Sequence, residues 1–177
     1  GGVAVAAGAE DVLVMEPTGP APYLAAARLP RQARVLRWWT GDPRCMMAGL
    51  GRGSFGGVLF TGYHAWGCCG GNPLSHTMTT ACDQVTLNGV PASEFLINAY
   101  TALYFGVPVP FLSGARELCA FAQAWLPGLV AVPVHAGRRG RVLSMHPQAA
   151  AAAARAGAAD PGGRPRPRRR GLPHTQT

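Results

Sequence analysis

Histidines and carboxylates are few in the middle of the chain, and the residues around them are mostly apolar or small. Within residues 57–114 they are His64, His76, Asp83 and Glu94. An imidazole titrates near neutral pH, so it can serve as a general acid or base or as a metal ligand. A carboxylate is costly to bury without a partner, so Glu94 in apolar surroundings needs a cation, a hydrogen-bond donor or a metal ion.

Each of these side chains also has a purely structural interpretation. Glu94 opens a predicted helix, where a carboxylate compensates the helix dipole and contributes about 0.3–1 kcal/mol. His64 has the spacing of a core histidine that bonds a backbone carbonyl. His76 lies between a Gly/Pro-rich loop and a hairpin, so it is free to project into a cleft. Residue spacing alone leaves both interpretations open for Glu94 and His64.

The flanking residues predict the elements that position these groups. The apolar run Gly57–Tyr63 predicts a buried strand that ends just before His64, at the edge where open α/β sheets bind ligands. Asn88-Gly89 is a strong turn signal and predicts a hairpin over residues 83–92. Ser93 is a good N-cap for a helix over residues 94–105, which is apolar on nearly every face and therefore predicted to be buried.

The rest of the chain alternates between strand and helix patterns, which predicts an α/β domain with a mostly parallel sheet and flanking helices. The further predicted strands are residues 11–15, 33–39, 107–112 and 129–134, and the further helical segments are residues 23–29, 44–50, 115–125 and 148–159. The remaining histidines, His135, His146 and His174, fall in weakly patterned segments and are expected at the surface.

Charge and composition divide the chain at about residue 160. The 177 residues carry a net charge of +8, and all 16 basic residues are arginine. Five of these arginines follow Gly163, so residues 1–160 form a nearly balanced domain. The Pro/Arg-rich residues 161–177 are expected to be a disordered tail. Nucleic-acid binding by this tail is a weaker expectation than a merely solvated segment.

Several classes of protein are disfavoured by the composition. No apolar run approaches the roughly 20 residues that span a bilayer, so no membrane association is expected. The five cysteines are odd in number and show no Cys-x-x-Cys, which disfavours a disulfide framework or a four-sulfur zinc site. A reduced, cytoplasmic protein is the expectation.

Several short motifs follow one another along the chain: Phe60-Thr61-Gly62-Tyr63-His64-Ala65, Leu74-Ser75-His76-Thr77-Met78, Leu87-Asn88-Gly89-Val90-Pro91-Ala92-Ser93-Glu94, Asn98-Ala99, Gly106-Val107-Pro108-Val109 and Ser113-Gly114. In this order they resemble the zinc D-aminopeptidases of the DppA type, and the resemblance covers residues 8–159. It implies a three-layer domain of the D-aminopeptidase kind. It also implies a metallopeptidase that removes N-terminal D-amino acids from short peptides, uses two zinc ions and assembles into a homo-oligomeric ring.

The resemblance also implies roles for individual residues. In the family an Asp and a Glu on the first strand, a turn histidine, the histidine of Gly-Tyr-His and the glutamate of Ser-Glu bind the metals. Carried over to this chain, His64 and Glu94 become metal ligands and His76 the catalytic histidine. Glu16 aligns beside a ligand position and is a further candidate ligand.

The chain departs from the family pattern at the other ligands. Thr18 stands where the turn histidine is expected, Ala115 replaces an acidic residue after Ser113-Gly114, and the Asp-x-Glu strand is expected to precede Gly1. Since only two of the five ligands align, we expect weak zinc binding and impaired hydrolysis. Two alternatives remain open: a non-catalytic relative that acts in assembly, and a nucleic-acid binder with a basic tail.

Overall fold

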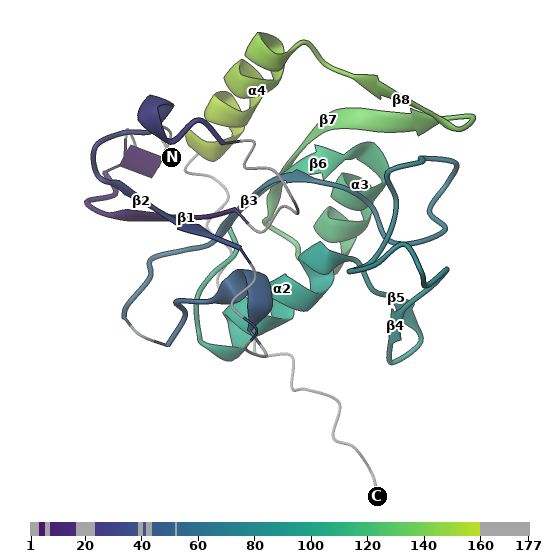
Figure 1. Ribbon diagram of the computed structural model, residues 1–177, viewed down its shortest axis with the longest axis horizontal. Coiled ribbons are helices and arrows are strands. Elements are labelled where there is room, and N and C mark those ends of the chain that lie inside the picture. The colour runs from purple at the N-terminus through teal and green to yellow at the C-terminus, as the bar shows by residue number, and fades with distance from the viewer. Residues whose placement is uncertain are drawn as a thin grey trace, which may run out of the picture.

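A four-stranded sheet forms the centre of the protein in the computed structural model (Figure 1). The described residues are 4–5, 8–16, 24–38, 41, 44–51 and 53–159. The strands of the central sheet, in spatial order, are β3 (Leu59–Tyr63), β6 (Phe111–Ala115), β7 (Val130–Arg138) and β8 (Arg141–Ser144). The first three are parallel, and β8 pairs antiparallel with β7.

Two smaller sheets accompany the central one. Strands β1 (Val12–Glu16) and β2 (Ala33–Arg37) pair in parallel, and β4 (Thr86–Leu87) and β5 (Val90–Pro91) form a short antiparallel hairpin. Two 3-10 turns, η1 (Ala26–Arg28) and η2 (Cys45–Met47), lie in the connections.

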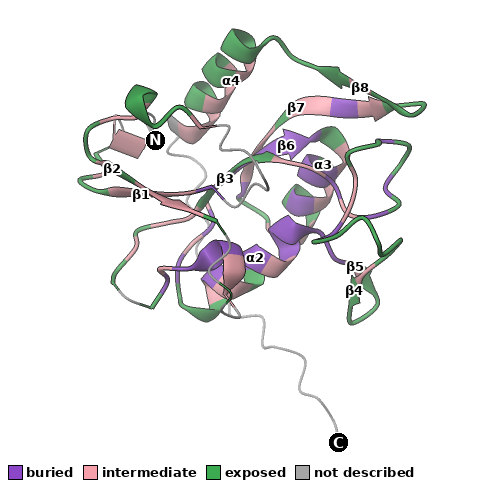
Figure 2. Ribbon diagram, in the orientation of Figure 1, coloured by how far each residue is buried: buried purple, intermediate pink, exposed green. Residues whose placement is uncertain are grey.

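Helices cover both faces of the central sheet because successive residues of a strand point to opposite sides. Leu112 belongs to the main apolar cluster, together with residues of α2 (Glu94–Tyr104) and α3 (Arg116–Trp125). The preceding residue, Phe111, instead faces Gly157 of α4 (Pro147–Ala159). Figure 2 shows the buried residues concentrated between the sheet and helices α2 and α3. The predicted three-layer α/β fold with a mostly parallel sheet is confirmed.

The local signals around the hairpin and helix α2 are also confirmed. Asn88 and Gly89 both have positive φ, at 51° and 78°, as a type I′ hairpin turn requires. The Ser93 hydroxyl accepts a hydrogen bond from the Leu96 amide at 3.1 Å and caps α2. This cap fixes Glu94 as the first residue of the helix.

Two predicted strands have different limits. The strand predicted over residues 107–112 begins at Phe111 and continues to Ala115, because Pro108 and Pro110 lack the amide hydrogen that a ladder needs. The strand predicted over residues 129–134 runs on to Arg138, where a turn leads into β8, which the sequence did not predict. His135 therefore lies within β7 and is half-buried, so its predicted surface position is wrong.

Two predictions of burial are wrong in part. In β3 only Phe60 is buried, because β3 is an edge of the central sheet among the described residues. Helix α2 buries the face that carries Phe95 and Ala99, but Tyr104 at its end is 80% exposed. The helix predicted over residues 23–29 is reduced to η1 in its described part, where Pro30 follows closely.

The structure does not test the predicted disordered tail, residues 161–177. Residues 160–177, which include His174, lie outside the described residues. Within the described part, the structure contains no helix with the length and apolar character needed to cross a membrane.

Gly114 gives a test of how tightly β6 packs against β3. A Cβ atom at Gly114 would lie 2.3 Å from the carbonyl oxygen of Tyr63, which is backbone and cannot rotate away. We expect Gly114→Ala to lower the free energy of unfolding by about 1–3 kcal/mol, measured by urea denaturation. Gly56→Ala is the matched control, since a Cβ there meets nothing within 4 Å. Equal stability of the two variants would contradict this packing.

Candidate metal centre

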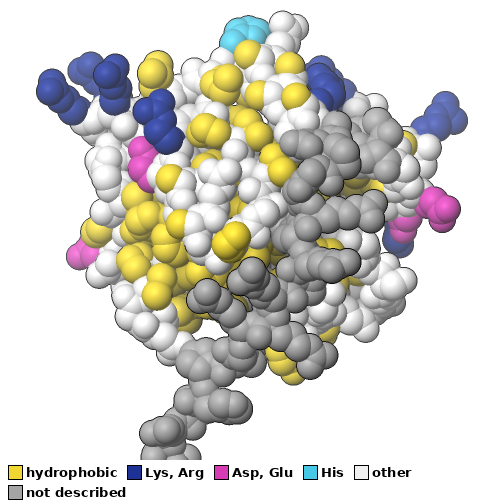
Figure 3. All heavy atoms as spheres, turned by 180° about the vertical axis from the view of Figure 1, so that it is seen from behind, with side chains coloured by type: hydrophobic (Ala, Val, Ile, Leu, Met, Phe, Trp, Pro, Cys, Tyr) yellow, Lys and Arg dark blue, Asp and Glu magenta, His cyan; other side chains and the backbone are white. Residues whose placement is uncertain are grey.

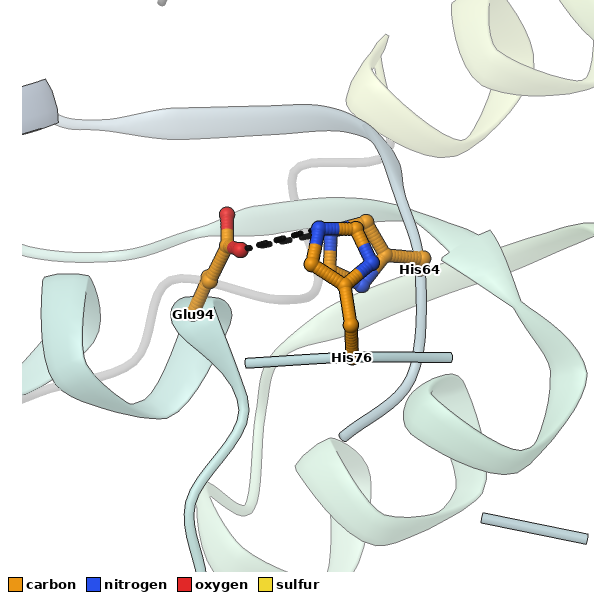
Figure 4. A group of neighbouring side chains, drawn as sticks. All are labelled: His64, His76 and Glu94. Carbon is orange, nitrogen blue, oxygen red and sulfur yellow. Dashed lines mark ion pairs between the residues drawn. The ribbon is translucent and has the colours of Figure 1, made fainter. Parts of the chain in front are cut away.

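Three side chains from separate elements converge at the carboxyl end of strand β3. His64 follows the last residue of β3, Glu94 is the first residue of α2, and His76 lies in the loop between them. Figure 4 shows both imidazole rings facing the Glu94 carboxylate. The structure therefore brings together the three residues that the sequence singled out.

One carboxylate oxygen lies close to both histidines. The Nε2 atoms of His64 and His76 are each 3.5 Å from Oε1 of Glu94. The two rings are stacked, with centroids 3.8 Å apart and planes inclined by 21°. Glu94 is buried, whereas both histidines are half-buried, so the carboxylate forms the inner side of the cluster and the imidazoles its outer side.

Backbone carbonyls fix which ring nitrogen carries the proton. Nδ1 of His64 lies 3.0 Å from the carbonyl oxygen of Ala65, and Nδ1 of His76 lies 2.8 Å from that of Leu74. A carbonyl oxygen only accepts hydrogen bonds, so each Nδ1 is the donor. In the neutral rings Nε2 then carries the lone pair, as in histidines that bind metals in proteins.

The Glu94 carboxylate has a further donor from the backbone. The Met78 amide donates to Oε1 at 2.9 Å, and Met78 adopts a left-handed backbone conformation with φ of 64°. Such a conformation is uncommon for a residue with a side chain and is concentrated at functional sites. Sequence reasoning missed this contact, although Met78 lies in the Ser75–Met78 motif.

Mutual interactions shift the pKa values of Glu94 and His64 in opposite directions. Burial raises the pKa of Glu94, but the hydrogen bond and charge of His64 and the Met78 amide outweigh it, so the pKa is lowered. Burial lowers the pKa of His64, but Glu94 and the Ala65 carbonyl outweigh it and raise the pKa. The metal-free pair is therefore an ion pair at mildly acidic pH.

The donor set fits a zinc ion in chemistry and in scale. Bonds of about 2.0–2.1 Å at tetrahedral angles separate two ligand atoms by roughly 3.3 Å. The two separations of 3.5 Å between Nε2 and Oε1 are close to this value, and the three candidate ligand atoms all lie within 4.8 Å of one another. Nitrogen and carboxylate donors are typical of catalytic zinc sites.

The other candidate ligand from the sequence lies outside this group. The carboxylate of Glu16 accepts a hydrogen bond from the Leu24 amide and lies 3.4 Å from Nη1 of Arg37, its neighbour across the β1–β2 pair. The structure thus gives Glu16 a cation partner within its own small sheet. Thr18 lies outside the described residues, and Ala115 is buried at the end of β6.

Fold and site together define an α/β domain with a candidate metal centre at the carboxyl end of strand β3. A family model described as D-aminopeptidase, peptidase family M55, matches residues 2–166, so the chain belongs to this family. A curated relative, the D-aminopeptidase of Bacillus subtilis (strain 168), is 31% identical over 129 residues. This match covers 72% of the chain and 45% of the relative.

A solved structure shares the fold. The Zn-dependent D-aminopeptidase DppA from Bacillus subtilis, described as a self-compartmentalizing protease, matches with a TM-score of 0.79 and 27% identity. The match covers 89% of this chain and 57% of that one, so the chain spans about half the length of the relatives it matches. The comparisons confirm the predicted family and give no support to a nucleic-acid binder or a non-catalytic assembly protein.

The opposite pKa shifts predict a pH window for the stability of the metal-free chain. Because folding raises the pKa of His64, the protonated ring stabilises the folded chain fully below the ordinary pKa of 6.5. This stabilisation is lost as the pH rises through the pKa of the folded chain. Because folding lowers the pKa of Glu94, the ionised carboxylate stabilises the folded chain above the ordinary pKa of 4.5. This stabilisation is lost as the pH falls through the pKa of the folded chain. The ion pair therefore stabilises most between these two pH values.

Urea denaturation of the chelator-treated chain and of Glu94→Gln measures this effect. We expect the free energy of unfolding of the wild type to exceed that of Glu94→Gln by more at about pH 5.5 than at about pH 8. Metal affinity should show the opposite trend and increase with pH, because a metal ion needs the deprotonated Nε2 of His64. A stability difference independent of pH would contradict the ion pair.

Proposed function

We propose that the chain contributes the centre of a zinc-dependent D-aminopeptidase, which hydrolyses the N-terminal D-amino acid from short peptides. The observation that supports this most directly is the pair of imidazole Nε2 atoms, each 3.5 Å from one buried carboxylate oxygen. Family membership and the zinc dependence of the D-aminopeptidase DppA support the same reaction. The family resemblance suggests two zinc ions for the complete centre.

We assign different roles to the two histidines. Because their rings are stacked and nearly parallel, their Nε2 lone pairs point in similar directions and converge poorly on one ion. His64 is the more enclosed of the two, with 21% of its side chain exposed against 32% for His76. We therefore infer that His64 and Glu94 bind metal, whereas His76 acts on the substrate.

The chain's own residues would divide the chemistry between them. Zinc, when bound, polarises a peptide carbonyl and lowers the pKa of a bound water. His64 and Glu94 would hold the ion against the end of β3 and the start of α2. His76, with its Nδ1 proton held by the Leu74 carbonyl, would use Nε2 to take a proton and pass it to the departing amine.

Metal content and hydrolysis of D-Ala-D-Ala test these roles together. We expect the unmodified chain to bind zinc weakly and to release D-alanine slowly, with no comparable hydrolysis of L-Ala-L-Ala. His76→Ala should abolish turnover while zinc stays bound, whereas Glu94→Gln should lower both. Zinc binding that survives Glu94→Gln, or turnover that survives His76→Ala, would refute the assignment.

Thr18 offers a gain-of-function prediction. The family resemblance places it where relatives carry a metal-binding histidine. We expect Thr18→His to increase zinc affinity at least about tenfold and to raise turnover, because it adds an imidazole ligand. Isothermal titration with zinc measures the change, and Thr18→Ser is the control. Equal affinities of the two variants would show that residue 18 does not face the metal.

We further propose that the chain assembles with copies of itself through the end of helix α2. Tyr100, Tyr104 and Phe105 expose aromatic surface there, and isolated aromatic clusters of this kind often mark interfaces. Hydrophobic side chains also gather on the face seen in Figure 3, with arginines at its periphery. The description of DppA as self-compartmentalizing supports a second copy as the partner.

Sedimentation velocity tests the assembly. Tyr104→Glu should shift the chain from a larger species to the monomer, because it places a charge in the interface. Leu143→Glu on β8 is the matched control, since Leu143 is similarly exposed but lies on another element. A shift in the control alone, or a wild type that is monomeric at all concentrations, would exclude this interface.

We also propose a cytoplasmic location. Cys68, Cys69, Cys82 and Cys119 all carry free thiols, which persist in a reducing compartment. Cell fractionation of the expressed protein, with thiol labelling of each fraction, tests this location.

A further inference from the structure

A hydrogen-bonded group next to the candidate metal centre joins its two supporting elements. Asn98 on α2 donates through Nδ2 to the Tyr63 hydroxyl at 3.2 Å and approaches the sulfur of Met46 at 3.6 Å. The Tyr63 hydroxyl in turn donates to the same sulfur at 3.9 Å. The group therefore links helix α2, the end of strand β3 and turn η2.

Both ends of this link are next to metal-site residues. Tyr63 immediately precedes His64 in the chain. Asn98 lies four residues after Glu94, on the same face of α2, because residues four apart in a helix lie one above the other. The contact between Asn98 and Tyr63 thus bridges the element that carries the imidazole and the element that carries the carboxylate.

The residues around Asn98 and Tyr63 hold the two side chains in one relative position. Asn98 is only 4% exposed, so its amide cannot exchange its protein partner for bulk water. The Tyr63 ring packs edge-on against Phe60, which packs edge-on against Phe95 of α2. The Tyr63 hydroxyl can donate to Met46 while it accepts from Asn98, so one group serves both contacts.

We infer that Asn98 is a positioning residue, which holds the end of β3 against α2 through the Tyr63 hydroxyl and so sets the distance between His64 and Glu94. This inference rests on the proposed metal site, and it adds a residue that touches neither metal nor substrate. Apolar contacts between the helix and the strand, such as that of Phe95 with Phe60, permit sliding. A directional hydrogen bond fixes their register.

Three variants separate positioning from general stabilisation. Asn98→Leu removes the donor, and Tyr63→Phe removes only the hydroxyl and is the milder change. Thr101→Val is the matched control: it removes a hydrogen bond within α2, from the Thr101 hydroxyl to the Ile97 carbonyl, that has no link to β3.

Titration of the folded protein with cobalt(II), followed by the visible absorption of the bound ion, measures the metal affinity of each variant. We expect Asn98→Leu and Tyr63→Phe each to weaken binding about 10–100-fold, as loss of supporting contacts around metal ligands does. The double variant should be no weaker than the single ones, because both act through one contact. Thr101→Val should bind like the wild type. Unchanged affinity in both single variants, or equal losses in the control, would overturn the inference.

A metal-free readout keeps this inference separate from the proposed function. In the chelated chain, nuclear Overhauser effects between the rings of His64 and His76 and the exchange protection of the Met78 amide report the preformed site. We expect Tyr63→Phe and Asn98→Leu to weaken both signals and Thr101→Val to preserve them. If the wild type binds no cobalt, the metal assignment fails while these signals still decide on Asn98; signals unchanged in the variants would refute its positioning role.

Discussion

A buried carboxylate that must be satisfied is the constraint on which the site depends. Glu94 cannot remain charged in the apolar junction between α2 and β3 without partners, and the desolvation of a lone carboxylate would outweigh any packing gain. Two imidazoles and one backbone amide meet at the same oxygen and remove this cost. The same convergence creates the metal-binding geometry, since a divalent cation takes the place of the His64 proton that otherwise balances the carboxylate.

The regular pairing of the central strands breaks where the site begins, and this brings the partners of Glu94 together. The β3–β6 register shifts between Phe60 and Tyr63, and the β6–β7 register shifts after Gly114. Such irregularities redirect side chains at sheet edges near functional sites. The absence of a side chain at Gly114 lets the Tyr63 peptide approach β6 closely, and His64 then turns toward the start of α2.

Local sequence signals predicted the two rigid parts of the site but not the contacts between them. Ser93 followed by an apolar run specified the start of α2, and the apolar run before His64 specified a strand end, because both signals act within a few residues. The hydrogen bond from the Met78 amide to Glu94 joins residues 16 positions apart, which local signals do not reach. Pro108 and Pro110 moved the start of β6 for a local reason, their missing amide hydrogens, to which the prediction gave too little weight. The ion pair of Glu16 with Arg37 arises from the pairing of β1 with β2, which an alignment of single residues cannot show.

The supports of the two histidines differ in a way that suits their proposed roles. His64 extends directly from a sheet strand, as a metal ligand requires if its geometry is to be held within a fraction of an ångström. His76 lies in a loop, but the loop is anchored beside it: the fully buried Thr77 hydroxyl donates to the Ala92 carbonyl at 2.7 Å and accepts from the Gly67 amide at 3.3 Å. Ala92 immediately precedes the Ser93-Glu94 cap, so Thr77 positions His76 relative to the carboxylate without fixing its ring. A group that must exchange protons with a substrate gains from this arrangement, because its backbone is held beside Thr77 while the Leu74 carbonyl orients its ring and leaves Nε2 for the proton.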